Sequence, residues 1–240
     1  RRSFGLGLIA HGIAGCDKLE NYAIQTEFAE KNVPKTGQVL NINGFNTHGY
    51  IEGDGAQDIV FIHGAHINLR DWVFANRPLS ILDSRSIYID RPGFGYSERD
   101  DTEWNAERQA DQARAYLKKI TGKNPILVGH SWGALVAISW AAKYPDEVKG
   151  VISVAGLNMP LSGVSKLAND TGMIKIAYEL YFTNVVSKVD RGSIKKFVSR
   201  IFKPQEIPKG YLDYLGSDLS RRLATIRANK NDLLATSNAL

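Results

Sequence analysis

Short β-branched runs alternate with helix-like segments between residues 58 and 154, and this alternation restricts the fold more than any other feature of the sequence. Two of the runs, 58–62 and 85–90, end abruptly at turn-forming residues, as buried parallel strands do. The pattern predicts strands at 58–62, 85–90, 125–128 and 150–154, with helices at 102–120 and 134–143. This order of elements predicts an α/β fold in three layers, with a mostly parallel sheet and right-handed crossovers.

Two segments flank this region. Between residues 38 and 53, apolar positions alternate weakly around Gly44 and Gly49, which predicts a hairpin of two strands. Strand-like runs stop near residue 160, so we assign 37–159 to a core and 160–240 to a helical segment.

The final 80 residues hold 13 Lys and Arg against 7 Asp and Glu, in a chain whose net charge is +5. They show no nucleic-acid signature, so no nucleic-acid partner is expected; a solvated helical surface or attraction to anionic lipid remains open.

The first 16 residues begin with two arginines, continue with a short apolar stretch and end in Ile-Ala-Gly-Cys. This pattern is typical of an export signal, and the stretch is too short to span a bilayer. Its end resembles a bacterial lipobox, whose cysteine is acylated, and Cys16 is the chain's only cysteine. We expect lipid attachment at Cys16, a tether over residues 17–36 and a location at the membrane of a bacterial cell envelope. The alternative is a cytoplasmic protein with an ordinary N-terminal helix and a buried Cys16.

Residues 129–133 (Gly-His-Ser-Trp-Gly) form a G-x-S-x-G sequence between an expected strand and an expected helix. A G-x-S-x-G sequence indicates a nucleophilic serine only when it lies between a strand and a helix, as it does here. Small residues on both sides of Ser131 allow a sharp, strained turn that lifts the hydroxyl clear of the sheet. The following helix then directs its N-terminus at a reacting carbonyl. Ser131 is therefore the candidate nucleophile.

Two blocks upstream of Ser131 follow the two preceding strands: residues 63–65 (His-Gly-Ala) and 90–97 (Asp-Arg-Pro-Gly-Phe-Gly-Tyr-Ser). The three blocks, in this order, resemble the α/β-hydrolase superfamily, in its cap-bearing branch of esterases, peptidases and C–C bond hydrolases. The resemblance covers about residues 38–155. It implies that Ser131 is the nucleophile and that the backbone N–H groups of Trp132 and Ala65 form an oxyanion hole. By position alone it also implies that residues 160–240 are a helical cap.

The resemblance also bears on the substrate. A serine nucleophile argues against the carboxylate-dependent dehalogenases and epoxide hydrolases of the superfamily and favours acyl transfer from a small ester, thioester or amide to water. His130, Phe94 and Tyr96 are expected to shape the substrate pocket, with core packing as the alternative for the aromatic residues. His63 is expected to be structural rather than the base. No metal and no organic cofactor is implied, and the sequence indicates neither the substrate nor the oligomeric state.

In this superfamily an Asp or Glu and then a His follow the serine, yet no histidine follows Ser131 in this chain. We expect that the last core strands, the acid and the histidine lie beyond residue 240, and that residues 1–240 alone are nearly inactive. The alternative is a non-catalytic protein of the same fold that lacks the triad and binds a ligand. The two interpretations differ in what the gene encodes next: an enzyme requires further strand patterns, an Asp or Glu and a His, and a binding protein does not.

Overall fold

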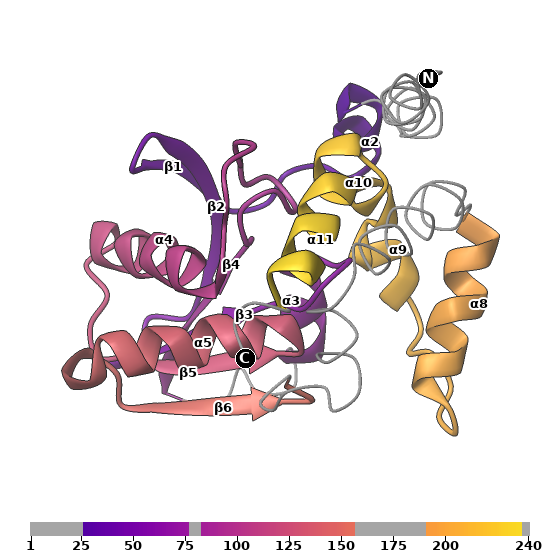
Figure 1. Cartoon of the computed structure of the whole chain (residues 1–240). Coiled ribbons are helices and arrows are strands. Elements are labelled where there is room, and N and C mark those ends of the chain that lie inside the picture. The colour runs from indigo at the N-terminus through magenta and orange to yellow at the C-terminus, as the bar shows by residue number, and fades with distance from the viewer. Residues whose placement is uncertain (1–25, 77–82, 157–190, 237–240) are drawn as a thin grey trace, which may run out of the picture.

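Six strands form a single mixed sheet in the computed structural model, which describes residues 26–76, 83–156 and 191–236 (Figure 1). Along the sheet the order is β1-β2-β4-β3-β5-β6. The β1–β2 and β2–β4 pairs are antiparallel, and the β4–β3, β3–β5 and β5–β6 pairs are parallel. The strands are β1 (Gln38–Ile42), β2 (Phe45–Glu52), β3 (Gln57–Ile62), β4 (Ser84–Ile89), β5 (Ile126–His130) and β6 (Gly150–Val154). The expected α/β fold and its N-terminal hairpin are confirmed.

Helices cover both faces of this sheet. The helical elements are α2 (Thr26–Asn32), α3 (Arg70–Asn76), α4 (Ala106–Lys119), α5 (Trp132–Lys143), a 3₁₀ turn (Pro145–Glu147), α8 (Arg191–Phe202), α9 (Tyr211–Leu215), α10 (Ser217–Ser220) and α11 (Leu223–Thr236). Among the described residues, no helix is long and apolar enough to cross a bilayer.

The alternation of side chains along β3 explains the layering. Val60 and Ile62 join a core with residues of α4 and α5, whereas Phe61, between them, packs with Val73 of α3 on the opposite face. Successive side chains of a strand point to opposite faces, so a strand buried on both must be apolar throughout. This is why residues 59–62 of β3 are a continuous apolar run rather than an alternating one, and why three layers form.

The helix predicted over 102–120 begins four residues later than expected. Asn105 is its N-cap, with a side chain that accepts a hydrogen bond from the N–H of Arg108. Before it, Asp100 accepts hydrogen bonds from the Thr102 hydroxyl and the Trp104 indole. The capping asparagine and this turn take residues 102–104 out of the helix.

The C-terminal helices pack directly on the core. The Tyr211 side chain of α9 bonds Asp71 of α3, and Leu219 of α10 packs against Ala29 of α2. The segment 17–36, expected as a tether, therefore differs in its described part: α2 is a packed helix, because its Ala29 is fully buried against α10. The signal-like residues 1–16 with Cys16, the tether up to residue 25 and most of the first half of the cap lie outside the described residues, so those predictions stay untested.

Candidate active site

Ser131 occupies a strained turn between β5 and α5. Its φ is 52° and its ψ is −118°, a combination that L-residues other than glycine rarely adopt and that costs about 1–3 kcal/mol. The Ser131 N–H donates to the carbonyl of Val154 at the end of β6, at 2.9 Å. The hydroxyl makes no capping bond to the helix that it begins. The turn thus holds Ser131 at the carboxyl end of the sheet, with a hydroxyl that does not cap α5.

The glycines of the motif are required by contact. A Cβ on Gly129 would lie 2.5 Å from Ala134 Cα, and one on Gly133 would lie 2.5 Å from the carbonyl oxygen of His63. Real Cβ atoms do not approach other heavy atoms so closely. The first residues of α5 are therefore packed directly against the strand end that carries residues 62–64.

The loop after β3 lies against the serine. A Cβ on Gly64 would lie 3.1 Å from Ser131 Cβ and 3.0 Å from His130 Nδ1, so the Gly64–Ala65 backbone approaches Ser131 as closely as glycine permits. Trp132 is the first residue of α5, and the N–H groups of a first helical turn point out along the axis. The sequence-predicted pair, Ala65 and Trp132, therefore lies on two segments that adjoin Ser131.

His63 fixes the loop as a neutral imidazole. Its Nδ1 lies 2.8 Å from the Gly64 carbonyl, and its Nε2 accepts from the backbone N–H of Arg91 at 3.0 Å. Burial, followed by the nearby Arg91 guanidinium, lowers the pKa of His63 to about 3. Nδ1 then carries the proton and donates to Gly64, so both ring nitrogens are used within the scaffold.

We expect His63 to make the fold weaker in acid. The unfolded chain binds a proton at His63 near pH 6.5, whereas the folded chain binds it only near pH 3. Between these values the unfolded state holds more protons, so the free energy of unfolding falls as pH drops, by at most about 1.4 kcal/mol per pH unit. Urea titrations between pH 7.5 and 4.5 should give a shallower fall for His63→Gln than for the natural chain. Identical slopes would contradict the assignment.

Asp90 connects residues 90–97 to the segments before and after β4. Its carboxylate accepts from His48 Nδ1 at 2.6 Å and from the backbone N–H groups of Leu69 and Tyr96. Burial alone would raise the pKa of this carboxyl, but the hydrogen bond and charge of His48 outweigh it and hold the pKa below its usual value. Asp90 and His48 are therefore a buried structural ion pair, with no role left for reaction.

Arg91 connects the loop to α11. Its guanidinium donates to the carbonyls of His63 and Gly64, at 2.9 Å each, and pairs with Asp232 at 2.5 Å. The guanidinium also lies over the ring of Trp132, 4.7 Å from its centroid. Both charges are buried, so each depends on the other to offset its desolvation.

His130, predicted to face the substrate, lies at the edge of this assembly and is about one-third exposed. Its Nδ1 is 3.9 Å from an Asp71 oxygen, and the other oxygen of Asp71 accepts from the Tyr211 hydroxyl at 2.6 Å. Burial, then the charge of Asp71, raises the pKa of Tyr211. A tyrosine from α9 and an aspartate from α3 therefore meet beside the residue that precedes Ser131.

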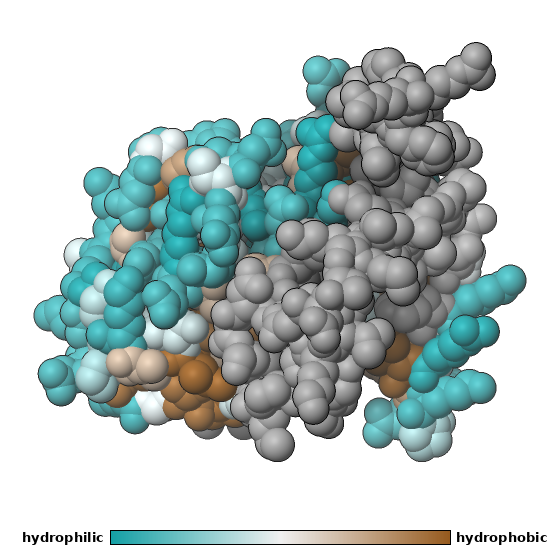
Figure 2. All heavy atoms as spheres, viewed as in Figure 1, coloured by the Kyte–Doolittle hydropathy of each residue, from teal (hydrophilic) through white to brown (hydrophobic). Residues whose placement is uncertain are grey.

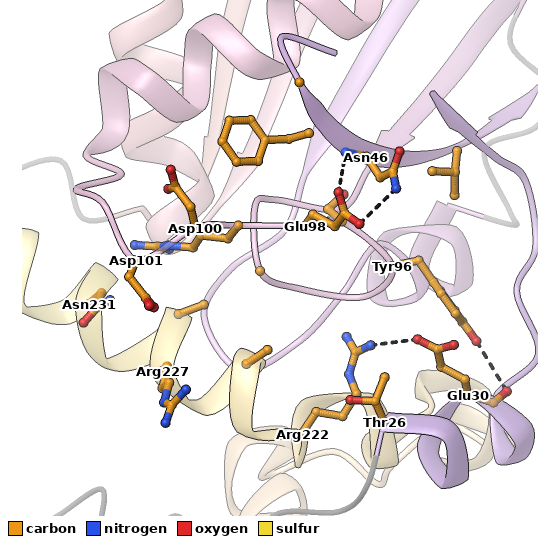
Figure 3. Close-up of a pocket in the computed structure, with 18 of the residues that line it drawn as sticks. Thr26, Glu30, Asn46, Tyr96, Glu98, Asp100, Asp101, Arg222, Arg227 and Asn231 are labelled. Carbon is orange, nitrogen blue, oxygen red and sulfur yellow. Dashed lines mark hydrogen bonds and ion pairs between the residues drawn. The ribbon is translucent and has the colours of Figure 1, made fainter. Parts of the chain in front are cut away.

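Phe94 and Tyr96, predicted to line the substrate pocket, lie in two different surroundings. Phe94 is fully buried, with its ring against His63 and the Arg91 guanidinium. Tyr96 lines a separate cavity of about 690 Å³ between α2, the β1–β2 hairpin and α11 (Figure 3). Its hydroxyl bonds the Val33 carbonyl. Burial of Phe94 fits the alternative of core packing, and a role of either ring in the substrate pocket stays a prediction.

No histidine among the described residues hydrogen-bonds the Ser131 hydroxyl. His48 is bound to Asp90 and the Thr36 carbonyl, and His63 holds the loop. Of the aspartates that follow the serine, Asp232 is committed to Arg91 and Arg99. Nor do three His, Cys, Asp or Glu side chains gather as metal ligands within the described part of the chain. The described residues thus place a candidate nucleophile, Ser131, and no histidine among them is hydrogen-bonded to it.

Sequence reasoning missed four residues of this assembly: Asp71, Tyr211, Asn229 and Asp232. The last two are three residues apart on α11, a spacing that puts them on one helix face, but the sequence does not show what that face contacts. Asn229 accepts a hydrogen bond from the His66 N–H at 2.7 Å. Thr225 is also buried on this helix, so the pattern of polar residues along α11 gave no signal that Asn229 and Asp232 are buried.

A family model described as the alpha/beta hydrolase fold matches residues 57–210. An uncharacterized protein of Bacillus subtilis is 26% identical over 73% of this chain and 53% of its own length. The 2-hydroxymuconate semialdehyde hydrolase of a Pseudomonas species is 30% identical over 56% of this chain and 49% of its own length. The chain thus spans about half the length of these curated relatives. Among solved structures, an esterase from Exiguobacterium antarcticum aligns over 83% of this chain and 74% of its own, with 17% identity and a TM-score of 0.62.

Proposed function

Because the chain belongs to the α/β-hydrolase family, we propose that the protein is a serine hydrolase that cleaves an ester, thioester or amide through an acyl-enzyme. The observation that carries the proposal is the backbone of Ser131, a non-glycine residue at φ 52° and ψ −118° between β5 and α5. Such strain persists only where the surroundings enforce it, and it is concentrated at functional sites. The tight contacts of Gly129 and Gly133 are what enforce it here.

The proposed chemistry is acyl transfer in two steps. Ser131 Oγ attacks the carbonyl carbon while a histidine takes its proton, and the carbonyl electron pair moves onto the oxygen. The N–H groups of Ala65 and Trp132 stabilise that charge, and such donors are commonly worth about 3–4 kcal/mol each. The tetrahedral intermediate then expels the leaving group, which takes the proton from the histidine. Water repeats the sequence on the acyl-enzyme and restores the serine.

We assign the histidine and its acid to a part of the protein outside these 240 residues. The β6 strand supports this assignment: within the described residues it pairs only with β5, and Ile152 and Val154 are 51% and 39% exposed. Figure 2 shows a hydrophobic surface beside the grey atoms along this edge of the molecule. Strands with this apolar composition are typically interior strands of a parallel sheet. Further strands beside β6 would cover these side chains and bring additional strand ends next to Ser131.

A serine-directed probe tests the proposal. A fluorophosphonate reacts when an activated serine oxygen displaces fluoride from phosphorus, which leaves a stable phosphonyl ester. In the full-length protein we expect the mass of the adduct on the peptide that contains Ser131, with none in Ser131→Ala. Residues 1–240 alone should react far more slowly, because the base is absent. Failure of the folded full-length protein to react, or reaction equal to that of heat-denatured protein, would contradict the proposal and favour a non-catalytic ligand-binding protein.

A further inference from the structure

Helix α11 touches both segments that carry the proposed oxyanion donors. Its Asn229 side chain accepts the His66 N–H at 2.7 Å, in the turn that begins at Ala65. Its Asp232 carbonyl accepts the indole N–H of Trp132 at 3.2 Å. Both residues are essentially inaccessible to solvent, at 1% and 0% exposure. Figure 1 shows the end of α11 lying beside the start of α5, where these contacts occur.

Helix α11 makes a second, indirect contact with the loop after β3, through Arg91. Asp232 binds Arg91 at 2.5 Å, and Arg91 in turn donates to the Gly64 carbonyl. Asp232 also accepts from Arg99 at 2.7 Å and from Gln109 at 3.0 Å, so its carboxylate has a fixed orientation. A buried carboxylate with this many donors holds each of them in place.

The turn that Asn229 holds needs support. His66 has a φ of 63°, a left-handed conformation that a residue with a side chain adopts at a cost. If His66 left this conformation, the backbone amides of the turn would point in other directions. Asn229 binds the N–H of His66 and so fixes the Ala65–His66 peptide. The Ala65 N–H belongs to the preceding peptide, whose Gly64 carbonyl accepts from Arg91, the partner of Asp232.

We propose that Asn229 and Asp232 are positioning residues: α11 aligns the Ala65 turn with Trp132 so that two N–H groups converge on one oxyanion. This inference rests on the proposed function, because it assigns α11 a part in the same site. A fixed pair of donors stabilises the transition state more than the bound substrate, since the charge develops only during reaction. Loss of alignment therefore lowers kcat and leaves KM nearly unchanged.

The first test uses full-length protein and a short-chain aryl ester. We expect Asn229→Leu, which has similar size but no acceptor, to lower kcat about 10- to 100-fold and to change KM less than about threefold. Asn231→Leu is the matched control: Asn231 is on the same helix but faces the cavity of Figure 3, so its kcat should match that of the natural protein. Ser131-dependent turnover with an unchanged kcat in Asn229→Leu would overturn the inference.

The second test needs no variant and separates the two proposals. Amide hydrogen exchange, followed by NMR, should show the His66 N–H protected to the level of the strand amides of β3. Exchange as fast as in an exposed loop would overturn the inference, whatever the activity. A protected His66 N–H in a full-length protein without Ser131-dependent hydrolysis would instead refute the proposed function, and with it the catalytic consequence of the alignment.

Discussion

Replacement of Gly133 with alanine is expected to lower the free energy of unfolding by up to about 2 kcal/mol. The new Cβ would press on the carbonyl oxygen of Ile62 and lie 2.5 Å from that of His63, and both oxygens belong to the backbone at the end of β3. Alanine favours a helix over glycine by about 1 kcal/mol, but overpacking against backbone that cannot move costs about 1–3 kcal/mol or more. The clash therefore dominates. Urea titration of the two proteins measures the difference.

Gly150→Ala provides the control for this substitution. Gly150 opens β6, and a Cβ there would meet nothing within 4 Å. The same chemical change should leave the free energy of unfolding unchanged or raise it by less than about 1 kcal/mol, because alanine restricts the unfolded chain. If Gly133→Ala were as stable as Gly150→Ala, the start of α5 would not be packed on β3 as described, and the enforced strain at Ser131 would lose its cause.

The sequence predicted the elements whose causes are local. Adjacent residues determine two of these elements. The β-branched run of β3 forms a strand buried on both faces, and the small residues of Gly-His-Ser-Trp-Gly permit a crowded turn. These positions therefore appear in the structure within a few residues of their predicted bounds. The late start of α4 has a local cause as well, since the Asn105 cap lies in the sequence that predicted the helix.

The parts of the site that the sequence did not predict depend on partners far along the chain. Asp232 is 141 residues from Arg91, and Asn229 is 163 residues from His66. No local pattern shows which distant backbone a buried polar side chain will bind. The surroundings of Phe94 and Tyr96 have a related origin: both follow a strand, but the partners of their side chains, His63 and the Val33 carbonyl, lie about 30 and 60 residues away in the sequence.

Two substitutions of Ser131 should separate its chemistry from its strain. In the full-length protein both Ser131→Ala and Ser131→Gly are expected to lower kcat for an aryl ester by at least about 10⁴-fold, since each removes the nucleophile. Their stabilities should differ. Alanine keeps the Cβ that is strained at φ 52°, whereas glycine adopts this backbone without a steric cost. Neither loses a helix cap, because the hydroxyl makes none.

The strain at Ser131 is worth about 1–3 kcal/mol, and the greater freedom of glycine in the unfolded chain offsets about 0.5–1 kcal/mol of it. Ser131→Gly should therefore be more stable than Ser131→Ala by about 1 kcal/mol, which urea titration resolves. If Ser131→Gly is more stable than Ser131→Ala and both lack turnover, the backbone at residue 131 is held in an unfavourable conformation that positions the serine hydroxyl for reaction. If glycine is no more stable than alanine, the turn is relaxed, and if turnover survives either substitution, Ser131 is not the nucleophile.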